Sequence, residues 1–393
     1  MSFNFDLVID RYHTGSIKYD FTAENNMPAD ILPLWIADMD FKAPPCVTEA
    51  LSRSVDHGIF GYSNVKRDYD AVVIDWFTRG FGWTPKAEWI VRTPGVVFAL
   101  STAVRTYTQP GDAVLIQTPV YYPFSRVVLQ NDRKLVTSEL IYMNGRYSID
   151  FEDFERKIIE NDVKMFILCS PHNPICRVWT ESELKQLGQI CQKHNVIVVA
   201  DEIHCDFAFP DHPHTPFLKI CPEMADRCIL CTAPSKTFNL AGLQVSNIFI
   251  PGETMRKLYT DELSRVGYSS LNILGLVASR AAYSDGREWL EACKAYLREN
   301  LDYVREFLKE NIPQIKLVEP EGTYFAWLDC TGLGLTPEEL EDLIIHRAKL
   351  WLDSGAIFGK CSEQFQRVVL ACPRSILETA MQRLKIAVDG GQV

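Results

Sequence analysis

The chain has 393 residues, of which 47% are hydrophobic, and its 40 basic and 51 acidic side chains give a formal net charge of −11. This composition is typical of a globular protein and excludes a disordered chain, and the length suits one large domain with a smaller companion. The acidic balance and the lack of a basic stripe argue against nucleic acid as a partner.

No segment has the pattern of a targeting peptide or a membrane span. The first residues, Met1 to Asp6, lack a basic stretch followed by an apolar one, and no apolar run approaches the length that crosses a bilayer. We therefore expect a cytoplasmic protein without a membrane partner. Twelve cysteines are scattered through the chain in apolar surroundings, which favours buried free thiols over a disulfide framework.

Two patterns could suggest a metal site, and neither is sufficient. Cys228 and Cys231 form a C-x-x-C pair, but they lie in a predicted strand, where residues three apart face opposite sides. His212 and His214 could bind a metal, but no third ligand accompanies them. We therefore predict no metal site.

The first 45 residues are irregular and rich in Asp, Pro and aromatic residues, and we expect them to wrap onto another domain or subunit. Beyond them, apolar segments alternate with helical patterns. The predicted strands are 113–116, 164–169, 196–200, 228–232 and 245–250. Thr180 to Glu183 has the pattern of a capping box, and the residues from Leu184 to His194 have helical spacing. Strands that are apolar on both faces and separated by helices predict a mostly parallel sheet buried by helices.

From about Asp285 the pattern becomes that of a smaller α+β region. Apolar residues at three- and four-residue spacing from Leu290 to Leu308 predict one long helix that stops at Pro313. A strand at 324–328 and helices over 337–350 and 375–388 follow. We divide the chain into an N-terminal segment (1–45), a large domain (46–285) and a small C-terminal domain (286–393).

Polar residues follow three of the predicted strands. Asn173 comes after 164–169, Asp201 after 196–200 and Lys236 after 228–232. In such sheets ligands bind at the carboxyl ends of the strands. A partly desolvated lysine can form a Schiff base with an aldehyde, and a buried carboxylate is a fitting partner for a protonated pyridine nitrogen. With an amide that can donate to a phenolate oxygen, the three residues predict a pyridoxal phosphate site.

Stretches along nearly the whole chain carry a family resemblance. They are Leu34–Phe41, Gly61–Tyr62, Thr93–Val97, Pro119–Phe124, Pro171–Pro174, Asp201–His204, Ser235–Asn239, Gly322–Leu328 and Ala371–Ser375. In these the chain resembles fold-type-I pyridoxal phosphate enzymes of the class I/II aminotransferase superfamily, and within it the MalY/PatB group of cystathionine β-lyases, or C–S lyases. The resemblance implies an α/β fold with a seven-stranded sheet like that of aspartate aminotransferase. It also implies a homodimer with active sites at the interface, in which residues 1–45 pack with the small domain and the partner.

The resemblance also assigns roles to residues. Lys236 would bind the cofactor covalently and act as the catalytic base, Asp201 would pair with the pyridine nitrogen, and Asn173 with the phenolate oxygen. Arg374 would bind the α-carboxylate of the substrate. The other implied cofactor contacts are Gly95, Val96, Val97, Tyr121, His204, Thr232, Ser235 and, across the dimer, Tyr62, and the other implied substrate contacts are Tyr121, Ile36 and Ala37.

Two departures from the aminotransferase pattern favour a lyase. Eight residues after Lys236, where many aminotransferases have an arginine, this chain has Gln244, and three residues after Asp201 it has His204 in place of tyrosine. We therefore expect α,β-elimination of cystathionine or a related S-substituted cysteine to a thiol, pyruvate and ammonia. The alternatives are an aminotransferase and, less favoured, a regulatory binding protein with incidental lyase activity.

Overall fold

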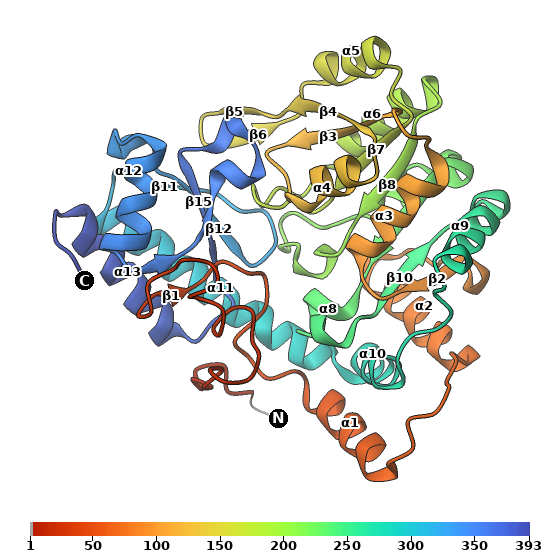
Figure 1. Cartoon of the computed structure of the whole chain (residues 1–393), viewed down its shortest axis with the longest axis horizontal. Coiled ribbons are helices and arrows are strands. Elements are labelled where there is room, and N and C mark those ends of the chain that lie inside the picture. The colour runs from red at the N-terminus through yellow and green to blue at the C-terminus, as the bar shows by residue number, and fades with distance from the viewer. Residues whose placement is uncertain (1–2) are drawn as a thin grey trace.

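A seven-stranded sheet forms the centre of the larger part of the molecule (Figure 1). The computed structural model describes residues 3–393. From edge to edge the strands are β2 (Ile90–Thr93), β10 (Ser246–Phe249), β9 (Cys228–Thr232), β8 (Ile197–Asp201), β7 (Met165–Cys169), β3 (Ala113–Thr118) and β4 (Lys134–Glu139). Strand β10 is antiparallel to both neighbours, and the other neighbouring pairs are parallel. The predicted mostly parallel sheet of seven strands is confirmed.

Alternate residues of the central strands pack into two hydrophobic clusters, one on each face. In β7, Phe166 and Leu168 belong to one cluster, and Met165 and Ile167 belong to the other. The first cluster includes residues of α2 (Arg67–Phe81), α5 (Phe151–Asn161), α6 (Glu181–Lys193) and α10 (Ile273–Asp285). The second includes residues of α3 (Val96–Tyr107), α4 (Pro123–Gln130) and α9 (Glu253–Arg265). Burial of both faces explains why these strands are continuous apolar runs in the sequence.

The predicted strand boundaries agree closely with the structure. The segment 228–232 matches β9 residue for residue, and the other four predicted strands differ by at most two residues at either end. Helix α6 begins at the predicted capping box, in which the Thr180 hydroxyl accepts the Glu183 N–H and the Glu183 carboxylate accepts the Thr180 N–H. These reciprocal bonds satisfy two backbone groups that the helix itself leaves free.

The C-terminal part is built on one long helix and a second sheet. Its elements are α11 (Arg287–Asn311), the antiparallel strands β11 (Lys316–Val318), β12 (Phe325–Asp329), β15 (Phe365–Val369) and β14 (Asp353–Ser354), and α13 (Arg374–Val388). The predicted helix over 337–350 is wrong in extent, because α12 covers only Pro337–Asp342 and one π-helical turn follows over Leu343–Arg347. Lys349 then takes a left-handed φ of 50°, and the chain turns into a strand pairing.

The N-terminal residues contact this C-terminal part. Strand β1 (Leu32–Pro33) pairs in parallel with β13 (Leu350–Trp351), and α1 (Pro45–His57) follows. The division into domains at 45/46 and 285/286 stays a prediction. The remaining short elements are β5 (Ile141–Met143), β6 (Arg146–Ser148), α7 (Phe217–Ile220) and α8 (Pro234–Thr237), with several 3-10 turns.

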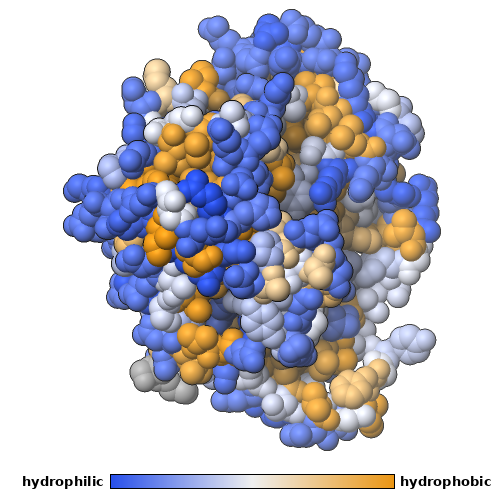
Figure 2. Space-filling model, turned by 60° about the vertical axis from the view of Figure 1, so that its left-hand side comes forward, coloured by the Kyte–Doolittle hydropathy of each residue, from blue (hydrophilic) through white to orange (hydrophobic). Residues whose placement is uncertain are grey.

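The surface over the C-terminal part is mixed in polarity. Figure 2 shows this face with hydrophilic residues interrupted by separate patches of hydrophobic ones. Within residues 3–393, the structure has no helix with the combined length and apolar character that crossing a bilayer requires.

Candidate active site

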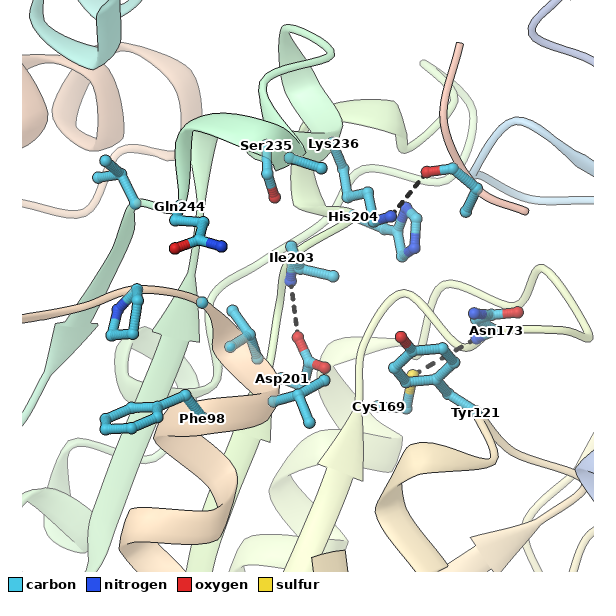
Figure 3. Close-up of a pocket in the computed structure, with 17 residues that line it drawn as sticks. Phe98, Tyr121, Cys169, Asn173, Asp201, Ile203, His204, Ser235, Lys236 and Gln244 are labelled. Atoms are coloured by element: carbon cyan, nitrogen blue, oxygen red, sulfur yellow. Dashed lines mark hydrogen bonds between the residues drawn. The ribbon is translucent and has the colours of Figure 1, made fainter. Parts of the chain in front are cut away.

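The carboxyl ends of β7, β8 and β9 open into a cavity of about 420 Å³ (Figure 3). Asp201 ends β8, Asn173 lies four residues beyond β7, and Lys236 lies on α8 just beyond β9. The predicted site residues that line the cavity are Ala37, Gly95, Val96, Val97, Tyr121, Asn173, Asp201, His204, Ser235 and Lys236. Most of the predicted site thus comes together at one edge of the sheet.

Lys236 reaches from α8 to the N-terminal segment. Its Nζ donates a hydrogen bond of 2.6 Å to the main-chain oxygen of Ala37. Removal from water lowers the pKa of Lys236 to about 8, with Arg367 adding to the effect and Asp38 and Asp201 opposing it. Near neutral pH an appreciable fraction of this amine is therefore unprotonated and nucleophilic.

Asp201 is buried at the bottom of the cavity, with 3% of its surface exposed. Its Oδ1 accepts the N–H of Ile203 at 3.1 Å. Burial raises the pKa of Asp201 to about 7, although Ile203 and Lys236 favour the ionised form. Among residues 3–393 no basic side chain forms a salt bridge with this carboxylate. A cationic ligand in the cavity would supply the missing counter-charge.

His204 is a buried neutral imidazole beside the lysine. Burial, together with the positive charges of Lys236 and Arg367, holds its pKa well below the usual value. The ring packs edge-on against Tyr324 and Phe325, with distances of 5.5 and 5.2 Å between ring centres. Its Nδ1 is buried without a hydrogen-bond partner among the described residues. This nitrogen is free to bond to a ligand in the cavity.

Asn173 is oriented by an arginine that the sequence analysis missed. Arg367 Nη1 donates to Asn173 Oδ1 at 2.8 Å, which leaves the amide nitrogen of Asn173 available as a donor. Arg367 is a buried residue of β15, paired with Asp353, and its Nη2 also donates to the Trp35 carbonyl. Its Nε is buried without a partner. A charged residue within the apolar run Phe365–Val369 was the one sequence signal for it.

Arg374, the predicted carboxylate-binding residue, is not brought to the cavity. It begins α13, where its Nε donates to Asn300 Oδ1 at 2.9 Å and its guanidinium lies 5.0 Å from the centre of the Tyr303 ring. These contacts fix it between α11 and α13. Arg374 is therefore not among the residues that line the cavity, and its carboxylate-binding role stays a prediction, whereas Arg367 contacts the lining residue Asn173.

Three further predicted residues lie outside the cavity lining. The Thr232 hydroxyl donates to the Asn247 carbonyl within the sheet, and so does not point into the cavity. Ile36 precedes the lining residue Ala37 but does not itself line the cavity. Tyr62 is fully exposed and borders a separate hollow of about 480 Å³ near α1 and α10.

The first turn of α3 forms part of the cavity lining. Gly95 is its N-cap residue, and the N–H groups that begin a helix attract anions, above all phosphate. Ser235 and Gln244 also line the cavity and supply a hydroxyl and an amide. The first turn of α3, Ser235 and Gln244 together are therefore suited to a phosphate group.

Glu202, for which the sequence suggested no role, is a structural residue. Its carboxylate is fully buried, accepts the Phe217 N–H at 2.7 Å and lies 2.9 Å from His214 Nε2. It thereby fixes the segment that precedes α7. The histidine considered as a metal ligand is thus bound to a carboxylate.

A model of the family described as "Aminotransferase class I and II" matches residues 29–384. The chain belongs to this family. Cystathionine beta-lyase PatB of Bacillus subtilis (strain 168) is 41% identical over 386 residues, which cover 98% of this chain and 100% of that protein. Protein MalY of Escherichia coli (strain K12) is 33% identical over 384 residues, with 97% and 98% covered.

Solved structures agree with the family assignment. The PLP-bound putative aminotransferase from Clostridium difficile 630 is 43% identical, with a TM-score of 0.96 over 98% of this chain and 100% of that one. The resemblance to the MalY/PatB group and the aspartate aminotransferase-like fold are therefore confirmed.

Proposed function

We propose that this member of the family is a pyridoxal phosphate-dependent carbon–sulfur lyase acting on cystathionine or a related S-substituted cysteine. The observation that carries the proposal is that Lys236 and Asp201 line the same cavity. One is an amine with a lowered pKa, and the other is a buried carboxylate without a salt-bridge partner among the described residues.

The residues present fit the cofactor. Asp201 would hold a proton on its ring nitrogen, the Asn173 amide would donate to its phenolate oxygen, and the first turn of α3 would bind its phosphate. Lys236 would attach it, and Tyr121 would lie against its ring. When bound, pyridoxal phosphate supplies an electron sink that stabilises negative charge on the α-carbon of the substrate.

The chain's own groups would carry out the rest of the reaction. The Lys236 amine would take the proton from the substrate α-carbon, as a base whose pKa lies near the working pH. Arg367 would bind the α-carboxylate, because its Nε is a buried donor without a partner. Departure of the thiolate from the β-carbon would then leave a fragment that hydrolyses to pyruvate and ammonia.

His204 and Gln244 favour elimination over transamination. Both replace residues that aminotransferases of this family usually carry, and relatives named cystathionine beta-lyase are similar along nearly their whole length. The competing activity is an aminotransferase, since one of the similar structures carries that name.

Purified protein given L-cystathionine alone should release pyruvate, detected with lactate dehydrogenase and NADH. Lys236→Ala should abolish this turnover and the visible absorbance of the lysine-bound cofactor, because Lys236 is the only lysine among the described residues that line the cavity. Turnover that requires an added keto acid would identify an aminotransferase and refute the lyase. Lys316→Ala, at the exposed first residue of β11, serves as the matched control and should behave as the wild type.

We also propose that two copies form the active unit, with Tyr62 reaching the partner's phosphate site. Large apolar or aromatic side chains are exposed together on this part of the surface: Val55, Ile59, Phe60 and Tyr62. Such a patch marks an association surface. Light scattering should give a mass of about twice 44.8 kDa. Phe60→Asp should reduce this mass to that of one chain and should also lower the affinity for the cofactor. A monomeric wild type with full activity would refute this proposal.

A further inference from the structure

The N-terminal segment provides the acceptor for the lysine amine. The Lys236 Nζ donates to the main-chain oxygen of Ala37 at 2.6 Å, and Figure 3 draws this hydrogen bond as a dashed line. The Tyr324 hydroxyl donates to the same oxygen at 3.2 Å. A carbonyl can only accept hydrogen bonds, so it takes an N–H of the amine and leaves the nitrogen lone pair free to receive a proton.

The residues around Ala37 are held from several sides. Asn239, three residues after Lys236, accepts the Met39 N–H at 3.0 Å and donates to the Met39 and Phe41 carbonyls at 2.9 and 3.0 Å. The short stretch that carries the lysine is thus fastened to the stretch that carries its acceptor.

A group of ion pairs adds to this attachment. Arg11 donates to both carboxylate oxygens of Asp38 at 3.1 and 2.7 Å, and to Asp40 Oδ1 at 2.7 Å. Lys18 is completely buried and donates to Asp40 Oδ2 at 2.7 Å. Removing one partner from a buried pair leaves an uncompensated charge, so these pairs resist displacement.

We propose that the Ala37 carbonyl is the docking position of the Lys236 amine whenever the lysine is not bonded to the cofactor. Arg11 and Lys18 are the positioning residues that hold this carbonyl in place through Asp38 and Asp40. The inference deepens the proposed function, on which its catalytic meaning rests. It makes the N-terminal segment a part of the reaction machinery as well as of the fold.

The charges of this segment also act on the lysine. The charged and titratable groups that face Lys236 are Asp38 from the N-terminal segment, Asp201 from β8, His204 beyond β8 and Arg367 from β15, and Tyr324 shares its acceptor. Asp38 favours the protonated amine, and Arg11 neutralises Asp38. Removing either member of the Arg11–Asp38 pair breaks the same contact but changes the charge near Lys236 in opposite directions.

Arg11→Met and Asp38→Asn therefore test the proposal together. In the cofactor-free full-length chain, the pH dependence of Lys236 acetylation by trace acetic anhydride is followed by peptide mass spectrometry. The midpoint should move up by about 0.5 pH unit in Arg11→Met and down by about as much in Asp38→Asn, a roughly threefold change in labelling rate at fixed pH. Arg305→Met, which breaks the distant Arg305–Glu319 pair, should leave the midpoint unchanged.

A merely structural role would shift both midpoints in the same direction or neither, and either result would overturn the proposal. If Arg11→Met fails to fold, Asp38→Asn decides alone, because Asp40 keeps its pair with Lys18. In the holoenzyme, the pH midpoint of α-hydrogen exchange of L-alanine in D2O should shift in the same direction in each variant. The labelling needs no cofactor, so a chain that fails to cleave cystathionine would refute the proposed function without altering this result.

Discussion

Asp201→Asn should stabilise the cofactor-free protein while impairing the holoenzyme. In the cofactor-free chain the buried carboxylate has no cation in salt-bridge contact among residues 3–393, and burial raises its pKa from 3.8 to about 7. An acid with a raised pKa binds its proton more tightly in the folded state. The folded state therefore loses stability as the pH rises from the unfolded pKa towards the folded one.

The magnitude follows from these two pKa values. Each pKa unit corresponds to 1.36 kcal/mol, so ionisation of Asp201 costs the folded state about 1.5 kcal/mol at pH 5 and about 4 kcal/mol at pH 8. Asparagine carries no charge at either pH. The stability advantage of Asp201→Asn over the wild type should therefore grow by about 2 to 3 kcal/mol between pH 5 and pH 8.

Urea unfolding of the cofactor-free proteins at both pH values measures this difference. Asp162→Asn, at the exposed C-terminus of α5, is the matched control and should show no such growth. Pyridoxal phosphate should stabilise the wild type more than Asp201→Asn, because only the carboxylate pairs with a protonated ring nitrogen. An advantage that is equal at pH 5 and pH 8 would refute the reasoning.

Three other comparisons between variants test separate contacts. Arg367→Lys should raise KM for cystathionine by about tenfold or more, because lysine lacks the planar guanidinium group that binds a carboxylate through two hydrogen bonds. Arg374→Lys should change KM less than about twofold. Steady-state kinetics compares the two variants, and a larger rise of KM in Arg374→Lys would support Arg374 as the carboxylate-binding residue. Glu202→Gln should lower the free energy of unfolding by about 1 to 3 kcal/mol, since the buried bond to His214 loses its charge; unchanged urea unfolding would contradict this. Thr180→Ala should lower it by about 1 kcal/mol through loss of the capping box, and Thr180→Ser, which keeps the hydroxyl, should restore most of the loss.

Polar residues at or within four positions of the ends of apolar strands were the predictable part of the site. Asn173, Asp201 and Lys236 each follow a continuous hydrophobic run, so the sequence shows that they stand at one edge of the sheet. Arg367 lies within a strand, and its partner Asn173 is 194 residues away in the chain. No local sequence pattern predicts which face of β15 lies towards the cavity. The family resemblance indicated Arg374 as the residue that binds the substrate carboxylate.

Helix ends set by distant contacts were also beyond the sequence. The pattern over 337–350 is helical, but Leu350 and Trp351 pair with β1, more than 300 residues earlier in the chain. Likewise, Thr232 ends β9 and could face either the cavity or the sheet, and its bond to the Asn247 carbonyl depends on the neighbouring strand. Tertiary contacts decided both cases, whereas α6 followed its local capping signal.

The reversed direction of β10 has a consequence for how this site can change. Neighbouring parallel strands need a crossover of a dozen residues or more, but an antiparallel neighbour starts where the previous strand ends. The connection 233–245 leads from β9 to its antiparallel neighbour β10 at the same edge of the sheet, so Lys236 and Gln244 both line the cavity from one connection. This connection therefore carries both the reactive amine of Lys236 and one of the residues proposed to lie near the phosphate, Gln244. A substitution at position 244 can therefore change the affinity of the site for an anion without changing the backbone that positions Lys236.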